Sequence, residues 1–528
     1  MSNKQLDAAV IGGGFSGIYM LYKLRESGLE TRVFEAGSGV GGTWFWNRYP
    51  GARCDIQSME YSYQFSDELA QEWEWSERYA TQPEILSYVD HVVERFDLMK
   101  DIQLNTRIAR TDYDETNQRW TVTTDSGETF DAKYVVMATG CLSSTNYPDI
   151  PGLRDFKGEL YHTGNWPHEG VDFSGKKVGV VGTGSSGIQS IPIIAEQCDE
   201  LYVFQRTANF SIPAHNQPLD PAFVADIKSR YSEFRDANRE TAFHADFDYN
   251  ELNALEVSPE DRQEEYERRW ARGGLPFMAA YADLMFDKDA NATAADFIRG
   301  KIEEIVEDPD LAEKLKPKNV VGCKRLCVDT NYYATFNRDN VTLVDISENP
   351  ITNISDNSVS AGEEYDVDVL VFATGFDALT GALTRIDIHG RGGELLRDNW
   401  EDGPQSFLGL GVHGFPNLFI ITGPQSPSVL TNMLPSIEHH VDWVGDCITY
   451  LEQKGLNAIE ASVDAQTDWV AHVNEVGDAS VYPHCNSWYL GSNVPGKPRV
   501  FLPYLGFPPY AEKCEEVARN DYEGFALS

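Results

Sequence analysis

The sequence lacks the features that would link it to a membrane, a nucleic acid or a secretory route. No apolar run approaches the roughly 20 residues that cross a bilayer as a helix, and the N-terminus passes from a short apolar run directly to glycines, which leaves no room for a signal peptide. Its 83 Asp and Glu against 43 Lys and Arg give a formal net charge of -40 at pH 7, whereas nucleic acids and anionic membranes need a positive surface. We therefore expect a cytoplasmic protein that binds neither, and we favour a monomer.

Cysteine chemistry is also sparse. The chain has eight cysteines and no CxxC motif. They are Cys54, Cys141, Cys198, Cys323, Cys327, Cys447, Cys485 and Cys514. Cysteines scattered in this way are typical of small buried thiols in a reducing compartment, and we expect no metal site.

The length and composition indicate a large globular protein. A chain of 528 residues is too long for one ordinary core and predicts two to four domains. The 41% of hydrophobic and 12% of aromatic residues, with no low-complexity tract, exclude disorder along most of the chain.

A glycine-rich turn follows the first apolar run. The stretch AAVIGGGFSGIYMLYKLRESG predicts a strand, a tight turn and a helix, with Gly12, Gly14 and Gly17 spaced as GxGxxG. Such glycines let the backbone turn sharply, approach a pyrophosphate and pack the helix against the strand. The next predicted strand ends in Glu35, where an acid accepts hydrogen bonds from a ribose 2′-hydroxyl. This unit suits the adenosine of FAD or NAD.

A second turn of the same kind appears in VGVVGTGSSGIQSIPIIAEQ, at Gly182, Gly184 and Gly187. Here the following strand, LYVFQRT, ends in Arg206 and Thr207 instead of an acid. An arginine at this position pairs with a 2′-phosphate that a carboxylate would repel. The second unit therefore suits NADPH, with a solvated surface charge as the alternative role for Arg206.

Between the two turns, FKGELYHTGNWP matches the FxGxxxHTxxW fingerprint of Baeyer–Villiger monooxygenases at Phe156, Gly158, His162, Thr163 and Trp166. The segments GVGGTWFWNRYPGARCD, GCKRLCVDTNYYATFNRDNV, GPQSPSVLTNMLPSIEHHVDW and SWYLGSNVPGKPR extend the resemblance over nearly the whole chain. It is most similar to the phenylacetone and steroid monooxygenase branch of these class B flavin-dependent monooxygenases. The fingerprint histidine is expected to link the domains and not to touch the substrate.

The resemblance implies an α/β fold with two Rossmann-like dinucleotide-binding domains. The two ATG strands, in YVVMATG and YDVDVLVFATG, are where the chain crosses between them. Residues 1–145 and 380–528 are expected to bind FAD, and residues 146–217 and 321–379 to bind NADPH. Residues 218–320, rich in charged and aromatic residues at helical spacing, are expected to form a helical insertion in the NADPH domain.

The activity implied is the conversion of a ketone, O₂ and NADPH into an ester or lactone through a flavin C4a-peroxide. In this pattern Arg325 is the catalytic cation, because arginine keeps its charge beside an anionic nucleophile. Asp55 matches the acid that holds this arginine near the flavin. Lys324 matches the lysine that pairs with the NADPH 2′-phosphate, and Trp488 matches a tryptophan that packs near the nicotinamide ribose. Gln425 and Val429 depart from the branch pattern, from which we expect a bulky, mainly apolar ketone, cyclic or aryl.

The residues that the resemblance assigns fall into three sets. The FAD set is Gly12, Gly14, Gly17, Glu35, Thr43, Trp44, Phe45, Trp46, Asp55, Tyr61, Ile108 and Met433. The NADPH set is Thr183, Gly184, Ser185, Ser186, Gly187, Ile188, Gln189, Arg206, Thr207, Lys324 and Trp488. The substrate set is Ser428, Val429, Leu430 and Met433. Ordinary core packing stays open as the role of Ile108 and Met433.

Three other functions fit parts of the pattern. A nitrogen- or sulfur-oxidising flavin monooxygenase would share both glycine turns, but the fingerprint, Asp55 and Arg325 disfavour it. A pyridine-nucleotide disulfide reductase needs a redox-active cysteine pair, which Cys323 and Cys327 in a CxxxC spacing are not expected to supply. A flavin-binding protein without activity is disfavoured because the charged site residues are all present.

Overall fold

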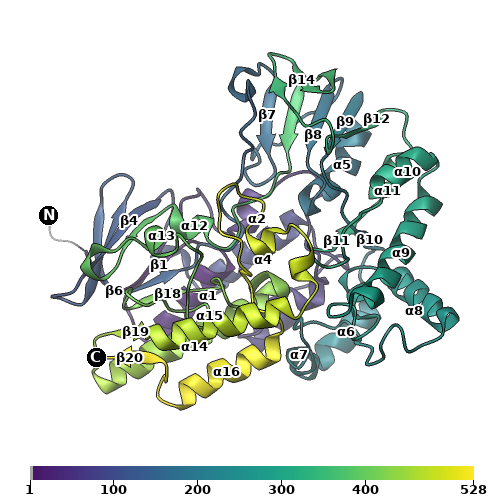
Figure 1. Cartoon of the computed structure of the whole chain (residues 1–528). Helices are drawn as coiled ribbons and strands as arrows, with labels where there is room; N and C mark the ends of the chain where they lie inside the picture. The colour runs from purple at the N-terminus through teal and green to yellow at the C-terminus, as the bar shows by residue number, and fades with distance from the viewer. Residues whose placement is uncertain (1–3) are drawn as a thin grey trace.

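Two sheets of mainly parallel strands form the framework of the molecule. The computed structural model describes residues 4–528 as two α/β units, with a lobe of helices attached to the second unit (Figure 1). The α/β fold with two nucleotide-type units is therefore confirmed.

The first sheet has eight strands in the order β17-β4-β5-β6-β1-β2-β3, with β18 also paired to β6. They are β1 (Lys4–Ile11), β2 (Thr31–Phe34), β3 (Ile102–Gln103), β4 (Ile108–Asp114), β5 (Arg119–Thr124), β6 (Thr129–Met137), β17 (Asp387–His389) and β18 (Leu418–Ile420). The inner end of β1 is continuously buried, as expected for a strand covered on both faces. Because β17 and β18 come from beyond residue 380, the C-terminal part of the chain completes the N-terminal sheet.

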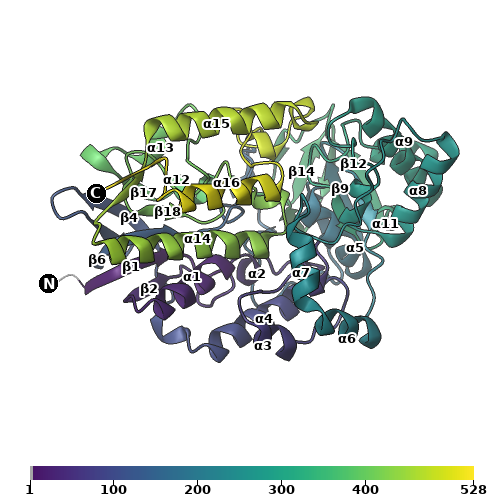
Figure 2. The same ribbon diagram turned by 90° about the horizontal axis from the view of Figure 1, so that it is seen from below.

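Long helices cover this sheet. They are α1 (Phe15–Glu26), α4 (Gln82–Arg95), α14 (Met433–Lys454), α15 (Val463–Asp478) and α16 (Phe507–Arg519). Figure 2 shows α14 between α1 and α16. α14 begins at Asn432, whose side chain accepts a hydrogen bond from the Leu434 amide, and ends at Gly455 in the left-handed region.

The second sheet is wholly parallel, in the order β12-β9-β8-β16-β7. Its strands are β7 (Glu159–His162), β8 (Lys177–Val181), β9 (Glu200–Gln205), β12 (Val341–Asp345) and β16 (Val369–Phe372), and α5 (Ser185–Gln197) follows β8. The fingerprint segment therefore supplies an edge strand of this sheet.

The helical lobe lies between β10 (Ser211–Pro213) and β11 (Cys327–Asp329), which pair in parallel. Its helices are α6 (Pro221–Ser229), α7 (Tyr231–Arg239), α8 (Pro259–Arg272), α9 (Lys288–Ile305) and α10 (Pro309–Leu315). Since β11 begins two residues after Arg325, the pairing that closes the lobe also fixes the end of the segment that carries this arginine.

Smaller elements complete the chain. They are α2 (Thr43–Trp46), α3 (Asp67–Glu72), α11 (Tyr332–Thr335), α12 (Gly381–Thr384), α13 (Leu396–Asn399), β13 (Asn353–Ile354), β14 (Ser358–Ala361), β15 (Glu363–Asp366), β19 (Ile459–Ala461) and β20 (Phe525–Leu527). No helix within residues 4–528 combines the length and apolar character needed to cross a membrane.

The expectation that all cysteines are free was wrong. Six are free and buried, but Cys323 and Cys485 form a disulfide across a separation of 162 residues. The reason is tertiary, because the C-terminal segment folds back onto the residues that precede Arg325.

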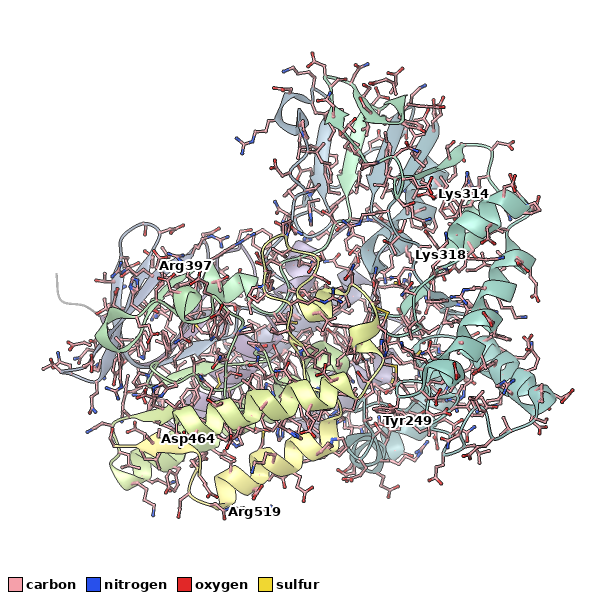
Figure 3. The ribbon with its side chains drawn as sticks, in the orientation of Figure 1. Tyr249, Lys314, Lys318, Arg397, Asp464 and Arg519 are labelled. Atoms are coloured by element: carbon pink, nitrogen blue, oxygen red, sulfur yellow. A yellow bond between two sulfur atoms is a disulfide. The ribbon has the colours of Figure 1, made fainter. Side chains whose placement is uncertain are left out.

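The cations labelled in Figure 3 lie on outer surfaces. Lys314 and Lys318 lie on the side of the helical lobe and second sheet, and Arg397 and Arg519 lie on the far sides of the first unit. Side chains crowd the junction between the units. Any anion bound at the junction must therefore be met by other basic residues.

The two glycine turns have nearly the same geometry. Gly12 and Gly182 lie at φ +113° and +109°, in the region that favours glycine. A Cβ on Gly17 would lie 1.8 Å from the Gly12 carbonyl oxygen, and one on Gly187 would lie 2.2 Å from the Gly182 carbonyl oxygen. Helix and strand thus approach as closely as glycine alone allows.

We predict that Gly17→Ala lowers the free energy of unfolding by about 3 kcal/mol or more, because the methyl group collides with backbone that cannot move aside. Gly300→Ala is the matched control, since Gly300 lies inside α9 with no atom within 4 Å of the added Cβ; it should be neutral or stabilising by up to about 1 kcal/mol. Denaturant melts of both variants measure the difference, and equal stability would contradict the packing described here.

Candidate functional site

An ion pair joins the two units at their junction. Arg325 donates from Nε to Oδ2 and from Nη2 to Oδ1 of Asp55, each over 2.9 Å. Its Nη1 donates to the Val429 carbonyl oxygen over 2.8 Å. Two parallel bonds to one carboxylate fix the plane of a guanidinium as well as its position. The structure therefore brings together the residues predicted as catalytic, from positions 270 residues apart.

The electrostatics of this pair keep the arginine charged. Burial acts to lower the pKa of Arg325, but the Asp55 carboxylate, together with Tyr489, more than offsets this, so the pKa is raised. The guanidinium carbon also lies 5.3 Å from the centre of the Phe243 ring, which comes from the helical lobe. A guanidinium has five N–H groups, so Arg325 can donate to a further oxygen while it remains paired.

Two further basic residues lie close to each other without an acidic partner. Burial, and then the nearby Arg206, lowers the pKa of Lys324. Within residues 4–528 neither side chain takes part in an ion pair or hydrogen bond. Two unpaired cations side by side, in a chain of net charge -40, favour an anionic ligand.

The turn beside these cations is open at a helix N-terminus. Gly184 caps α5 at φ -85° and ψ -172°, almost as Gly14 caps α1 at φ -84° and ψ -170°, and neither helix has a side-chain cap. A Cβ on Gly184 would meet no atom within 4 Å. Uncapped amides at a helix N-terminus are a binding site for phosphate. The hydroxyl of Thr183 donates to the Thr207 carbonyl oxygen and so links the turn to the end of β9.

Gln189 has a role that the sequence pattern did not predict. Its Oε1 accepts from the Tyr49 hydroxyl over 2.8 Å, and its Nε2 donates to the Arg53 carbonyl oxygen over 3.1 Å. Arg53 in turn pairs with Glu77. The NADPH-type helix therefore holds the loop that leads to Asp55.

The first unit is arranged for an adenosine and a flavin. The buried Glu35 carboxylate accepts from the amides of Gly13 and Gly37, over 2.7 and 2.6 Å. The buried hydroxyls of Ser144 and Thr422, beyond the ends of β6 and β18, have no protein partner in the described part of the chain. Since buried hydroxyls seldom lack a partner, they fit a ligand that supplies one.

The aromatic run in α2 packs inward as the FAD assignment needs. Trp44 Nε1 donates to the Tyr61 hydroxyl over 3.1 Å, and both rings are buried. Ile108 lies on β4 in the core cluster that also contains Trp120, and Met433 packs partly buried at the start of α14. Core packing fits both residues, and their assignment to FAD stays a prediction.

The fingerprint segment joins the units through its backbone. His162 is fully buried, its Nδ1 accepts from the Gly164 amide over 3.0 Å, and its Nε2 lies 3.4 Å from the Thr374 hydroxyl. The Trp166 amide donates to the Trp46 carbonyl oxygen of α2. Burial lowers the pKa of His162 to about 4, so it is neutral and structural.

The segment predicted to line the substrate side contacts the arginine through main chain. Ser428–Leu430 forms a short 3₁₀ turn whose middle carbonyl accepts from Arg325. Gln425 is buried, and its amide bonds with the Ser406 hydroxyl and the Pro404 carbonyl oxygen. These bonds hold the Gln425 side chain against residues 404–406, where it supports the turn.

Sequence reasoning missed Phe243 and Tyr489 as neighbours of Arg325. Phe243 belongs to the charged and aromatic stretch of the lobe, in which no motif marks one ring above another. Tyr489 stands next to the predicted Trp488, and their ring centres are 4.1 Å apart. That adjacency was the only available signal.

We predict that His162 makes the fold sensitive to acid. The neutral imidazole stabilises the fold fully above its unfolded pKa of 6.5, and this contribution is lost as the pH falls toward about 4. Between pH 7 and 5 the wild type should lose about 2 kcal/mol of unfolding free energy more than His162→Asn. Denaturant melts at both pH values measure this, with the exposed His484→Asn as control; parallel losses in wild type and His162→Asn would refute a buried neutral histidine.

Known proteins share this architecture over the full chain. Residues 9–266 match the family described as pyridine nucleotide-disulphide oxidoreductase. The chain is 44% identical to a phenazine N-monooxygenase of Lysobacter antibioticus, over 99% of this chain and 97% of that protein. It is 43% identical to a Baeyer-Villiger monooxygenase of Pseudooceanicola batsensis, over 98% of this chain and 95% of that protein. The solved structure of an oxidised steroid monooxygenase bound to NADP matches with a TM-score of 0.95 and 51% identity over 99% of both chains. The chain therefore belongs to the Baeyer–Villiger monooxygenase family of flavin-dependent enzymes.

Proposed function

We propose that this protein oxidises a bulky, mainly apolar ketone, cyclic or aryl, to an ester or lactone, using FAD, NADPH and O₂. The overall reaction is ketone + O₂ + NADPH + H⁺ giving ester, NADP⁺ and water. The observation that carries this proposal is the Asp55–Arg325 ion pair, a fixed cation held at the junction of two nucleotide-type units. Because the reaction consumes an intracellular reductant, we also propose a cytoplasmic location.

The two units divide the cofactors. Residues 1–145 and 380–528 would hold FAD. The amides of Gly13 and Gly37 fix the Glu35 carboxylate, which would face the ribose. Residues 146–217 and 321–379 would hold NADPH, and residues 218–320 form the helical lobe beside it. FAD and NADPH held there would supply the hydride transfer and the oxygen activation that the reaction needs.

Selection of NADPH over NADH follows from Lys324 and Arg206. A 2′-phosphate carries close to two negative charges, and the two unpaired cations beside the open α5 turn match it. The repulsion between the two cations and the burial of Lys324 raise the free energy of the ligand-free protein, and a bound phosphate would relieve both. The free 2′-hydroxyl of NADH would leave this repulsion unrelieved.

Arg325 would act on the oxygen of the ketone. As a nucleophile adds to the carbonyl carbon, negative charge develops on the carbonyl oxygen, and a preorganised donor lowers the energy of that state. Asp55 sets the plane of the guanidinium, while the Val429 carbonyl and the Phe243 ring restrict its movement. The cation is therefore in place before charge develops.

The residues around the arginine favour an apolar substrate. Val429 and Leu430 are nearly fully buried in the turn that contacts Arg325, and the Phe243 ring covers another side of the guanidinium. Acceptance of small cyclic ketones alone by the purified enzyme would contradict a bulky substrate.

Nitrogen oxidation is a second candidate, because one relative at 44% identity is a phenazine N-monooxygenase. An aromatic nitrogen attacks the activated oxygen with its own lone pair, so no oxyanion forms on the substrate. Such a reaction would depend much less on Arg325 than ester formation does.

We predict that Arg325→Ala lowers the rate of ester formation by about 100-fold or more. Anaerobic reduction of the bound flavin by NADPH should stay within about threefold of wild type. The reason is that Arg325 pairs with Asp55, whereas the cations proposed to bind NADPH are Lys324 and Arg206. Stopped-flow absorbance and product mass spectrometry measure the two steps. Arg397→Ala, on the outer surface, serves as the control. Normal ester formation by Arg325→Ala would show that another group stabilises the developing charge.

A further inference from the structure

The disulfide between Cys323 and Cys485 lies beside the candidate site. Cys323 is fully buried and directly precedes Lys324 and Arg325. Cys485 is only partly buried and precedes Trp488 by three residues. The cross-link therefore connects the segment that carries both site cations to the C-terminal segment that carries the tryptophan assigned to NADPH.

Besides the packing of the buried Tyr482, Tyr489 and Leu490 in the core, few hydrogen bonds tie this part of the C-terminal segment to the rest of the protein. The amide of Val481 donates to the Met285 carbonyl oxygen, and the Gln425 amide donates to the Leu502 carbonyl oxygen. Between these two positions the hydrogen bonds to other segments come from Asn493 and Lys497. Asn493 donates to the Phe376 carbonyl oxygen and accepts from the Asn146 side chain at its own carbonyl oxygen, and Lys497 contacts Asp377 and the Ala378 carbonyl oxygen. Among the described residues, the hydrogen bonds of Cys485 and its neighbours stay within the segment, including two from Arg499.

The position of the segment matters for both cations. Tyr489 acts electrostatically on Arg325, and its ring lies tilted against Trp488 with 4.1 Å between ring centres. Figure 1 shows the yellow chain between α15 and α16 rising toward the second sheet. If the cross-link opens, the tyrosine and tryptophan lose the one covalent tie that sets their distance from Lys324 and Arg325.

The sulfur atoms differ in a way that suits thiol exchange. An external thiolate would attack the Sγ of Cys485, the less buried of the two residues, forming a mixed disulfide and releasing Cys323 as a thiolate. The Nδ2 group of Asn319 lies 3.4 Å from Cys323 Sγ and can donate to the released anion. A second external thiol then displaces the first, so that one protein disulfide and two thiols give two protein thiols and one external disulfide. The reverse exchange with an external disulfide restores the link.

We propose that Cys323–Cys485 is a thiol-responsive latch for the segment from residue 482 to residue 500. Closed, it keeps Trp488 and Tyr489 against the cation-bearing segment and favours NADPH binding. Open, it frees the segment and weakens that binding. The role in NADPH binding rests on the proposed function, whereas the latch itself is a property of the fold.

The latch is tested on the purified flavin-loaded protein before and after treatment with dithiothreitol. Thiol titration in denaturant should count six free thiols before treatment and eight after, since eight cysteines include one disulfide. Reduction should raise the Kd for NADP⁺ roughly fivefold or more and speed tryptic cleavage after the exposed Arg499. Cys485→Ser should reproduce both effects without dithiothreitol and no longer respond to it.

Cys198→Ser is the matched control, because Cys198 is a free buried thiol at the end of α5; it should respond to dithiothreitol as the wild type does. Eight free thiols in the untreated protein, or an unchanged Kd and cleavage rate after reduction, would overturn the latch. Neither readout needs a ketone to be oxidised. A missing ester product together with a clear shift in cleavage would contradict the proposed function and leave the latch intact.

Discussion

The partly buried ion pair of Asp55 and Arg325 is the interaction on which the rest of the site depends. Removing either partner would leave an uncompensated charge among buried aromatic and apolar groups, which proteins tolerate poorly. The pair forms only if the loop before Asp55 lies against α5, where Gln189 holds it, and if the lobe closes through β10 and β11 next to Arg325. One contact thus requires both units and the lobe to be in place.

The same architecture fits the proposal that two similar turns bind different ligands. Gly14 and Gly184 present nearly identical helix ends, but Glu35 stands beside the first, and Arg206 with Lys324 stands beside the second. A neutral ribose suits the acid and a phosphate suits the cations. The fingerprint segment joins the two units through the Trp166 amide and the Trp46 carbonyl oxygen.

The features that the sequence predicted are local or carried by a motif. The glycine spacings determine turns within a few residues, and the resemblance identified Asp55 and Arg325 although they lie 270 positions apart. What it did not predict depends on tertiary packing without a motif. Phe243 reaches Arg325 because of how the lobe folds. The Gln425 side chain is held by a hydrogen bond from the Ser406 hydroxyl. Cysteine pairing cannot be deduced from spacing.

The central claim is that the fixed cation directs an oxygen atom into a carbonyl compound. The most direct measurement is turnover of the purified enzyme with NADPH under ¹⁸O₂, offered phenylacetone, cyclohexanone, a steroid ketone and a phenazine, with products analysed by mass. We predict one ¹⁸O atom in an ester or lactone from the bulkier ketones. Label found only in a phenazine N-oxide or in hydrogen peroxide, with every ketone unchanged, would contradict it.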